Sequence, residues 1–264
     1  MTQAAEVTEV GGPEPGPAGQ PTRRDRLRAA TTGEIIATAR QLLVASGPDS
    51  VSLRGIAREM GMTAPGLYRY FGSHTELLRH VCASIYTELA GDIKQAIHAA
   101  DAELGPDQMT EQLTIKMVAA CREFRRWSLN HKAEFAVLFG VPLPGVDYMR
   151  YDIADECALE FANTFFAMFL ELWSRAPFPV LAAGDIDPGL RGQLLRYRDA
   201  LGADIPVGAV LTFLRCWFVL YGAVAMEVFG HINFALEDPA PMFEIILGDL
   251  ASLVGLTYPV SEGA

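Results

Sequence analysis

The sequence lacks the short motifs that mark nucleotide-binding and hydrolytic enzymes. It has no Walker loop, no GxSxG elbow, no HExxH pair and no GxGxxG after a predicted strand. Its histidines show no metal-ligand spacing; they are His74, His80, His98, His131 and His231. We therefore expect no catalytic residues, no cofactor and no metal. An enzyme is therefore the weakest interpretation of this sequence.

Cysteine is scarce, and no CxxC pair is present among Cys82, Cys121, Cys157 and Cys216. Such spacing is typical of buried thiols in a reducing compartment, and a redox-sensing pair is the alternative. The N-terminus lacks the basic start and apolar core of a signal peptide. We therefore expect a cytoplasmic protein.

A single long apolar run, residues 206–229, could be mistaken for a membrane span. However, Arg215 lies near its centre and Glu227 near its end, and a mid-span arginine is costly in a bilayer. A helix buried between subunits explains the composition better. Arg215 and Glu227 are too far apart to pair within one helix, which leaves a buried pair, a dimer contact or a ligand anchor open.

The net charge of −11 argues against a nucleic-acid partner until its distribution is considered. Residues 23–80 carry nine arginines against five acidic residues, whereas residues 81–264 carry 12 basic and 24 acidic residues. DNA affinity depends on the local field, which is screened over about 10 Å. A small basic segment on an acidic body therefore remains compatible with DNA binding.

The chain shows no β alternation and no internal repeat, which predicts an all-α fold. Residues 1–22 are rich in proline and glycine and are expected to be disordered. A helix then ends near Gly47 and Pro48. Three more follow, namely two short ones and a longer one opened by a capping box at Ser73–Glu76. Beyond Gly105 and Pro106 the expected helices are 109–129, 131–139, 152–174, 189–200, 206–229 and 240–254, with breaks at 141–145, 177–188 and 237–239.

Residues 52–71 have the pattern of a helix-turn-helix. Ser52 is expected to cap the first short helix and Thr63 the second, and Gly61 supplies the left-handed turn between them. Leu67 and Phe71 are four residues apart and must point inward. Tyr68 and Tyr70 then face outward, as side chains of a recognition helix do in the DNA major groove.

The segment from about Thr31 to Ala90 resembles the DNA-binding domain of TetR-family transcriptional regulators. The matching text is Val51-Ser52-Leu53-Arg54-x-Ile56-Ala57-Arg58-Glu59-x-Gly61, then Pro65-x-Leu67-Tyr68-x-Tyr70-Phe71 and Glu76-Leu77-Leu78. The resemblance implies a DNA-binding head over residues 23–90 and a helical ligand-binding and dimerisation domain over residues 91–264. It also implies a homodimer through about 206–229 and 240–254.

The second half is similar to the branch of the family named for a C-terminal Trp-His-Gly motif. The corresponding residues are Trp217, Tyr221 and Gly222, so tyrosine stands where that motif has histidine. Arg126-Trp127 and Phe139-Gly140 also match the branch. Tyr221 therefore cannot supply the imidazole of that motif.

The resemblance places the DNA contacts on the two short helices and their flanks. Tyrosine hydroxyls can donate to phosphate oxygens, and alanine and proline can meet a thymine methyl. Because few residues here read bases, DNA shape is expected to contribute to specificity. The expected DNA-binding residues are Arg28, Ser52, Arg54, Thr63, Ala64, Pro65, Gly66, Tyr68, Tyr70 and His74.

Each of these assignments has a plainer alternative. Tyr68 and Tyr70 can simply pack on the scaffold, and Arg54 can be a solvated charge. Residues 23–28 are expected to be either a basic arm that enters the minor groove of DNA or a tail exposed to solvent. His74 replaces a lysine common in the family, which would weaken a phosphate contact near neutral pH.

The expected ligand site combines aromatic rings with a few polar tips, which suits an apolar or aromatic small molecule. For each residue, ordinary core packing is the alternative. The residues are Cys121, Phe124, Trp127, Phe165, Phe169, Trp173, Phe213, Trp217 and Tyr221.

Together these features predict a ligand-responsive repressor that binds a pseudo-palindromic operator as a homodimer. A dimeric DNA-binding regulator without an inducer, or an activator, is the alternative. The sequence identifies neither the effector nor the operator.

Overall fold

The computed structural model describes residues 22–47, 51–101, 109–140 and 153–258. Outside these ranges lie residues 1–21 of the segment expected to be disordered, together with the expected breaks at 105–106 and 141–145.

Within the described ranges the only regular elements are helices, so the predicted all-α fold is confirmed. Each helix expected beyond residue 108 is present with its ends shifted by one residue at most. The elements are α1 (Arg23–Ser46), α2 (Leu53–Glu59), α3 (Ala64–Leu67), α4 (His74–Asp101), α5 (Met109–Asn130), α6 (Lys132–Phe139), α7 (Ile153–Arg175), η2 (Ala183–Asp185), α8 (Pro188–Ala200), α9 (Val207–Val228) and α10 (Ala240–Leu253).

Helix α1 begins at Arg23 and so includes the residues that the sequence predicted to be a basic arm. The Thr22 hydroxyl accepts a hydrogen bond from the Asp25 amide, and the Asp25 carboxylate accepts one from the Thr22 amide at 3.0 Å. This capping box satisfies amides that would otherwise lack partners, so the helix starts at Arg23. The interpretation of residues 23–28 as an arm or a tail is therefore wrong, because these arginines form the first turns of α1.

The turn between the two short helices follows the sequence prediction. The Ser52 hydroxyl caps α2 by accepting from the Gly55 amide at 3.0 Å, and the Thr63 hydroxyl caps α3 by accepting from the Gly66 amide at 3.2 Å. Gly61 has φ +64, which an L side chain rarely adopts. Both caps and the glycine turn are confirmed.

Two local predictions need correction. The second short helix is α-helical only over Ala64–Leu67, so Tyr68 and Tyr70 lie in the turns after it. The capping box at Ser73 is half formed. Its hydroxyl accepts from the Glu76 amide at 3.0 Å, but the Glu76 carboxylate turns to the Gly72 amide, 2.7 Å away. The Gly72 amide precedes the helix and competes successfully for that carboxylate.

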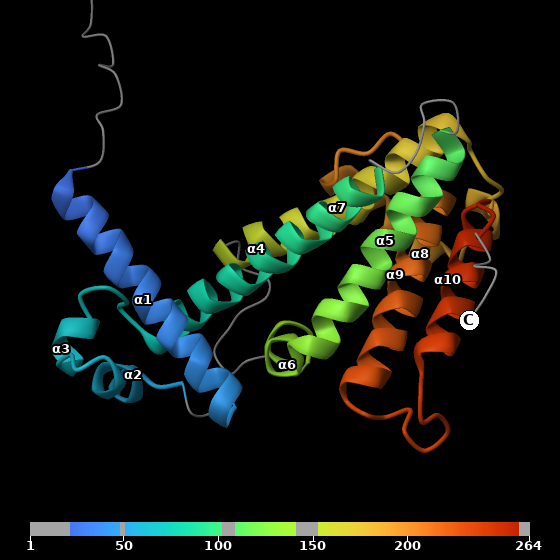
Figure 1. The fold of residues 1–264 in the computed structure, drawn as a ribbon. Coiled ribbons are helices and arrows are strands. Elements are labelled where there is room, and N and C mark those ends of the chain that lie inside the picture. Colours follow the sequence, from blue (N-terminus) through green and yellow to red (C-terminus); the bar gives the residue numbers. More distant parts are fainter. Residues whose placement is uncertain (1–21, 48–50, 102–108, 141–152, 259–264) are drawn as a thin grey trace, which may run out of the picture.

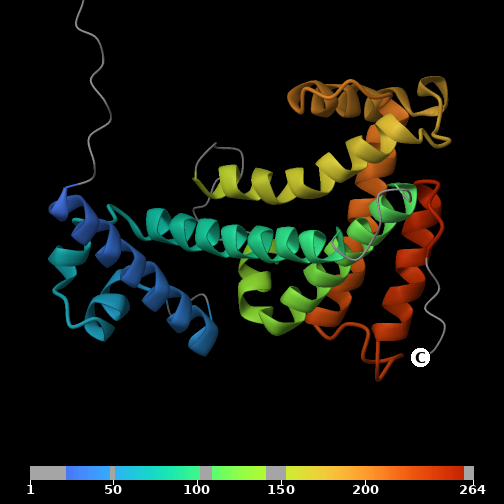
Figure 2. The ribbon, with the colours of Figure 1, turned by 45° about the horizontal axis from the view of Figure 1, so that its top comes forward.

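The molecule has two parts joined by one long helix (Figure 1). The head comprises α1 to α3 and the first turns of α4, and its core includes Ile35, Ile56, Leu67 and Phe71. The body comprises the rest of α4 with α5 to α10. Figure 2 shows α4 running from the head beside α7 into the body. The expected domain boundary at residue 90 falls inside this continuous helix, so the division at that residue stays a prediction.

The apolar run became α9, which packs against α5, α8 and α10. Among the described helices, only α9 is long and apolar enough to cross a membrane by length and composition, and 39% of its most apolar window is buried in the protein. Glu227 near its end is buried against Arg125 of α5, with a shortest contact of 2.7 Å. Glu227 therefore belongs to a buried ion pair, and its partner is Arg125 rather than Arg215, which is exposed.

Candidate DNA-binding surface and ligand cavity

The tip of the head exposes the residues expected to meet DNA. Tyr68 is 52% exposed, the largest exposure of any aromatic side chain in the head. Thr63, Pro65 and Arg54 are also exposed, and Gly66 is buried against the Thr63 hydroxyl. Tyr68 therefore stands free of the scaffold, which favours contact with a partner over packing.

Arg28 has partners inside the head. Its Nη2 donates to the Arg69 carbonyl at 3.1 Å, and its guanidinium lies 5.6 Å from the centre of the Tyr70 ring. These contacts tie α1 to the turn after α3 and stabilise the position of Tyr70. The structure thus places Arg28 behind Tyr70 as a support, with its remaining N–H groups still able to donate to phosphate.

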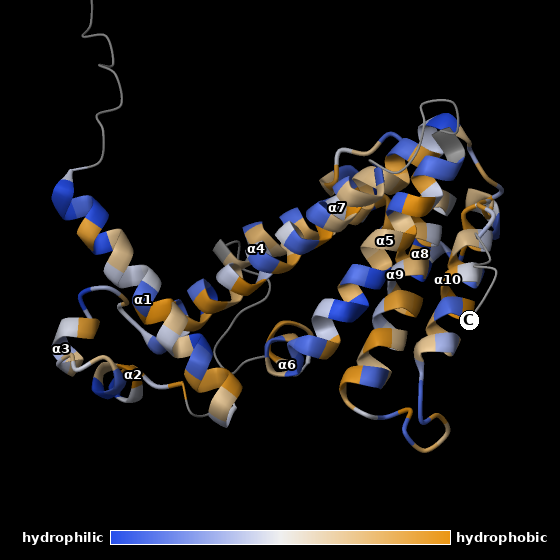
Figure 3. Cartoon of the chain, in the orientation of Figure 1, coloured by the Kyte–Doolittle hydropathy of each residue, from blue (hydrophilic) through white to orange (hydrophobic). Residues whose placement is uncertain are grey.

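The same region is strongly basic. A hollow on the surface lies between the first turns of α1 and the α3 turn, bordered by Arg23, Arg24, Arg28, Arg69 and Tyr70. In Figure 3 the start of α1 is drawn in the blue of hydrophilic residues. Such a local concentration of arginine attracts phosphate even though the whole chain is acidic.

His74 and Ser52 have roles inside the protein. The His74 Nε2 contacts the Val51 carbonyl, which holds the start of α4 against the start of α2. The Ser52 oxygen accepts from a backbone amide, so its hydroxyl hydrogen is the part left for phosphate. Ala64 is half-buried at the start of α3.

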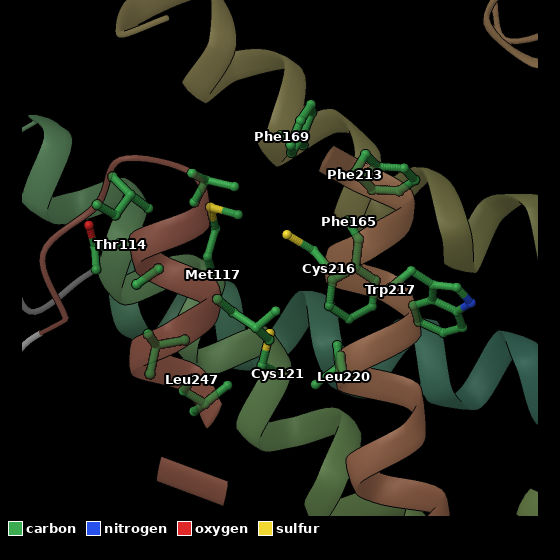
Figure 4. Close-up of a pocket in the computed structure, with 15 residues that line it drawn as sticks. Thr114, Met117, Cys121, Phe165, Phe169, Phe213, Cys216, Trp217, Leu220 and Leu247 are labelled. Carbon is green, nitrogen blue, oxygen red and sulfur yellow. The ribbon is translucent and has the colours of Figure 1, made fainter. Parts of the chain in front are cut away.

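The body contains a cavity of about 70 Å³ between α5, α7, α9 and α10 (Figure 4). Five of the residues expected to bind a ligand line it: Cys121, Phe165, Phe169, Phe213 and Trp217. A single water needs about 10–15 Å³ by this measure, so the cavity has room for several heavy atoms. Its lining is almost wholly apolar.

The other four residues expected in the ligand site lie elsewhere. Phe124 is fully buried among rings of Phe135, Phe139, Phe161, Phe165 and Trp217. Trp127 is also fully buried, Trp173 packs edge-on against Phe178 at 5.0 Å, and the Tyr221 hydroxyl donates to the Phe139 carbonyl at 2.6 Å. These aromatics form the core beside the cavity.

Sequence reasoning missed most of the aliphatic and sulfur-containing lining. The spacing held a signal, because the lining residues of α5 and α9 recur at three- and four-residue intervals on one face of each helix. The additional residues are Thr114, Met117, Val118, Cys216, Leu220, Leu247, Leu250, Ala251, Val254 and Leu256.

Sulfur atoms face the cavity from two sides. Figure 4 shows the sulfur atoms of Met117 and Cys121 of α5 and of Cys216 of α9 around the same space. Removal from water raises the pKa of the Cys121 thiol to about 12 and that of Cys216 to about 11, and the nearby Cys216 contributes to the rise at Cys121. Both groups are neutral thiols at neutral pH. The four cysteines are free, and each is of intermediate burial; the side chains of Cys121 and Cys216 border the apolar cavity.

These pKa values predict slow alkylation of the cavity thiols. At pH 8 we expect iodoacetamide to label Cys121 and Cys216 at least about 100-fold more slowly than a free cysteine, because the thiolate is the nucleophile. The rate should keep rising as the pH approaches 11. Peptide mass spectrometry measures the labelling, and the chain unfolded in guanidinium is the control. Labelling of the folded chain at the rate of the unfolded chain would contradict the expectation.

A charged contact joins the head to the body. Arg40 of α1 donates to both carboxylate oxygens of Glu88 on α4, at 2.5 and 2.9 Å, and to Glu134 of α6 at 3.1 Å. The hydrogen bond from Arg40 lowers the pKa of the Glu88 carboxyl, and the bond to Glu88 raises the pKa of Arg40. The Trp127 indole also donates to Glu88, at 3.4 Å.

Within the described ranges, no three His, Cys, Asp or Glu side chains come together in a way that could hold a metal ion.

Two family models match the chain. The model described as "Bacterial regulatory proteins, tetR family" matches residues 35–81, and the model described as "Tetracyclin repressor-like, C-terminal domain" matches residues 117–250. The chain belongs to the TetR family. The first match covers α2 and α3 with the second half of α1, and the second includes most of the residues that line the cavity, from Met117 to Leu250.

Curated relatives of this TetR-family chain are regulators. It is 27% identical over 224 residues to the HTH-type transcriptional regulators Rv1816 of Mycobacterium tuberculosis and Mb1846 of Mycobacterium bovis, which covers 84% of the chain and 91% of each relative. The chain is thus a DNA-binding transcriptional regulator and not an enzyme. Its place in the Trp-His-Gly branch stays a prediction.

Solved structures show the same fold. Regulatory protein SCO4313 is 26% identical with a TM-score of 0.64, and the alignment covers 88% of this TetR-family chain and all of that protein. RolR in complex with resorcinol is 15% identical with a TM-score of 0.51, over 88% of this chain and 90% of RolR. This second likeness concerns the fold alone.

Proposed function

We propose that the chain is a ligand-responsive repressor. In this proposal a cytoplasmic homodimer binds a pseudo-palindromic operator and releases it when a small apolar or aromatic effector occupies the cavity. The cavity is the observation that carries the proposal, because a packed core normally has few voids larger than one water. An alternative is a dimeric regulator without an inducer, or an activator, depending on where the operator lies relative to the promoter.

The lining of the cavity supports an uncharged effector. Thr114 contributes its only hydroxyl group, and the two thiols are neutral at neutral pH. The lining offers no charged group to pair with an ionised ligand, and burying an unpaired charge is costly. Resorcinol, the ligand of RolR, is an uncharged small aromatic molecule and is a reasonable first probe.

An apolar stripe on α9 and α10 supports the homodimer. Phe218 of α9 is 67% exposed and Ile245 of α10 is 62% exposed. Figure 3 shows both helices rich in the orange of hydrophobic residues. Gly222 lies on the same face as Phe218, with open space where a side chain would be, so a partner helix can approach closely there. Other exposed members of the stripe are Val219, Met226, Phe229 and Met242.

A thermal-shift panel of small uncharged molecules, resorcinol included, tests the ligand response. We expect at least one member to raise the melting temperature by several degrees and to weaken operator binding. Ala251→Met extends a flexible side chain into the cavity and should abolish the shift. Ala167→Met, on an exposed face of α7, is the matched control and should keep it.

The outcomes separate the candidates. A ligand that raises the melting temperature of Ala251→Met as much as that of the unmodified chain binds outside the cavity. That result would rule out the cavity as the ligand site. No shift from any member of a broad panel would favour the regulator without an inducer.

A further inference from the structure

The contact between Arg40 and its two carboxylates differs from the ion pairs on the surface of the body. The Glu134 side chain is only 6% exposed, and the Arg40 side chain is 21% exposed. A carboxylate this buried needs a charged partner, and removing the partner costs far more than breaking an exposed pair. The pair formed by Arg122 and Glu244, whose side chains are 48% and 41% exposed, is an exposed one of similar forked geometry.

The three partners come from three different helices. Arg40 lies on α1 of the head, Glu88 on α4 and Glu134 on α6. Figures 1 and 2 both place α6 beside the C-terminal end of α1, and the two helices are in contact. Because an arginine fork fixes direction as well as distance, Arg40 sets how α1 is oriented against α4 and α6.

The other face of α6 belongs to the aromatic core beside the cavity. The Phe139 ring lies 6.4 Å from Trp217, which lines the cavity, and the Phe135 ring stacks on Tyr221 of α9 at 6.2 Å. The Tyr221 hydroxyl bond to the Phe139 carbonyl fixes the end of α6 to α9. α6 is therefore held between the cavity wall and Arg40 by continuous packed contacts.

We propose that Arg40 is a positioning residue for DNA binding. In its holding role, Arg40 keeps the head in the orientation that binds DNA. In its transmitting role, Arg40 passes a displacement of α6, caused by an occupied cavity, on to the head. The holding role depends only on the structure, whereas the transmitting role rests on the proposed ligand response. Arg40 acts through Glu88 and Glu134.

The test uses the full chain and a DNA duplex that the unmodified chain selects from a random pool. Arg40→Lys keeps the positive charge and loses the fork, so we expect it to fold with a melting temperature within about 3 °C of the unmodified chain. Its DNA dissociation constant should rise about 5- to 50-fold, which lies within the range of about 5- to 150-fold typical of coupled sites. Arg40→Gln should lose at least as much affinity. Arg122→Lys is the matched control, and its DNA affinity should stay within twofold of the unmodified chain.

Amide hydrogen exchange gives a second measurement that needs no DNA. We expect faster exchange in the C-terminal half of α1 and in α6 for Arg40→Lys, but not for Arg122→Lys. Unchanged exchange in Arg40→Lys, or DNA affinity within twofold of the unmodified chain, would overturn the holding role. If the chain selects no duplex from the pool, the proposed DNA-binding function is contradicted. The hydrogen-exchange measurement then still tests whether Arg40 holds α1 against α6.

The transmitting role is tested by combining variants. If Ala251→Met, which fills the cavity, weakens DNA binding alone but adds less than twofold in the Arg40→Lys background, transmission through Arg40 is supported. If Ala251→Met lowers DNA affinity equally in both backgrounds, transmission through Arg40 is overturned, but the proposed ligand response is not contradicted. If Ala251→Met does not weaken DNA binding in either background, filling the cavity does not affect the head, and the transmitting role is overturned. The holding role is then decided by the DNA affinity and hydrogen exchange of Arg40→Lys alone.

Discussion

Tyr68→Ala should weaken binding to the selected duplex by about 10- to 100-fold with little change in melting temperature. The side chain is 52% exposed, so its removal costs little packing in the free protein. On DNA its hydroxyl and ring contacts are lost together, and the expected 10- to 100-fold loss corresponds to about 1.4–2.8 kcal/mol in total. Fluorescence anisotropy at several salt concentrations measures the loss.

Two variants sharpen the Tyr68 result. Tyr68→Phe removes the hydroxyl alone and so separates a phosphate contact from stacking along the sugar edge. Tyr197→Ala removes a tyrosine of α8 that is 37% exposed, and it should bind DNA normally. An unchanged dissociation constant for Tyr68→Ala would show that the tip of the head is not the reading surface.

Phe218→Asp should convert the proposed homodimer into a monomer and reduce affinity for the selected duplex more than 100-fold. The substitution places a carboxylate in the centre of the apolar stripe, where a dimer would have to bury it without a partner. A monomer loses the gain in affinity that comes from binding two half-sites simultaneously, which is about 10²–10⁴-fold. Sedimentation velocity and anisotropy measure the two effects.

The control for Phe218→Asp introduces the same charge on another helix. Leu190→Asp lies on α8, where the side chain is 40% exposed. We expect Leu190→Asp to remain dimeric and to bind the operator. A Phe218→Asp chain that sediments as a dimer at micromolar concentration would rule out the α9 stripe as the interface.

The predictions that succeeded depend on neighbours in the chain. Ser52, Gly61 and Thr63 act on amides or turns within three residues, so their roles follow from local sequence. The helix ends in the body were predictable for the same reason. The start of α1 was missed because basic composition suggested an arm, although Thr22 and Asp25 carry the capping signal.

The limits of the cavity depend on packing between distant segments. Phe124 lies one turn beyond Cys121 on the same helix and was expected in the ligand site. Rings from α6, α7 and α9 fill the space around it, so the cavity ends before that turn. Aromatic character alone could not reveal this. The contact between Arg40 and Glu134 joins residues 94 positions apart, and no local pattern predicts it.

The continuity of α4 gives the molecule a mechanical property. Its 28 residues, at 1.5 Å per residue, make a rod of about 42 Å that carries the head at one end and reaches into the body at the other. A tilt of about 5° at the body end displaces the far end by roughly 4 Å. In the proposed symmetric homodimer the two displacements would add to roughly 7 Å, about a fifth of the 34–36 Å between successive major grooves. In the proposed repressor, a small tilt of α4 in the body would therefore be enough to move both heads out of register with their half-sites.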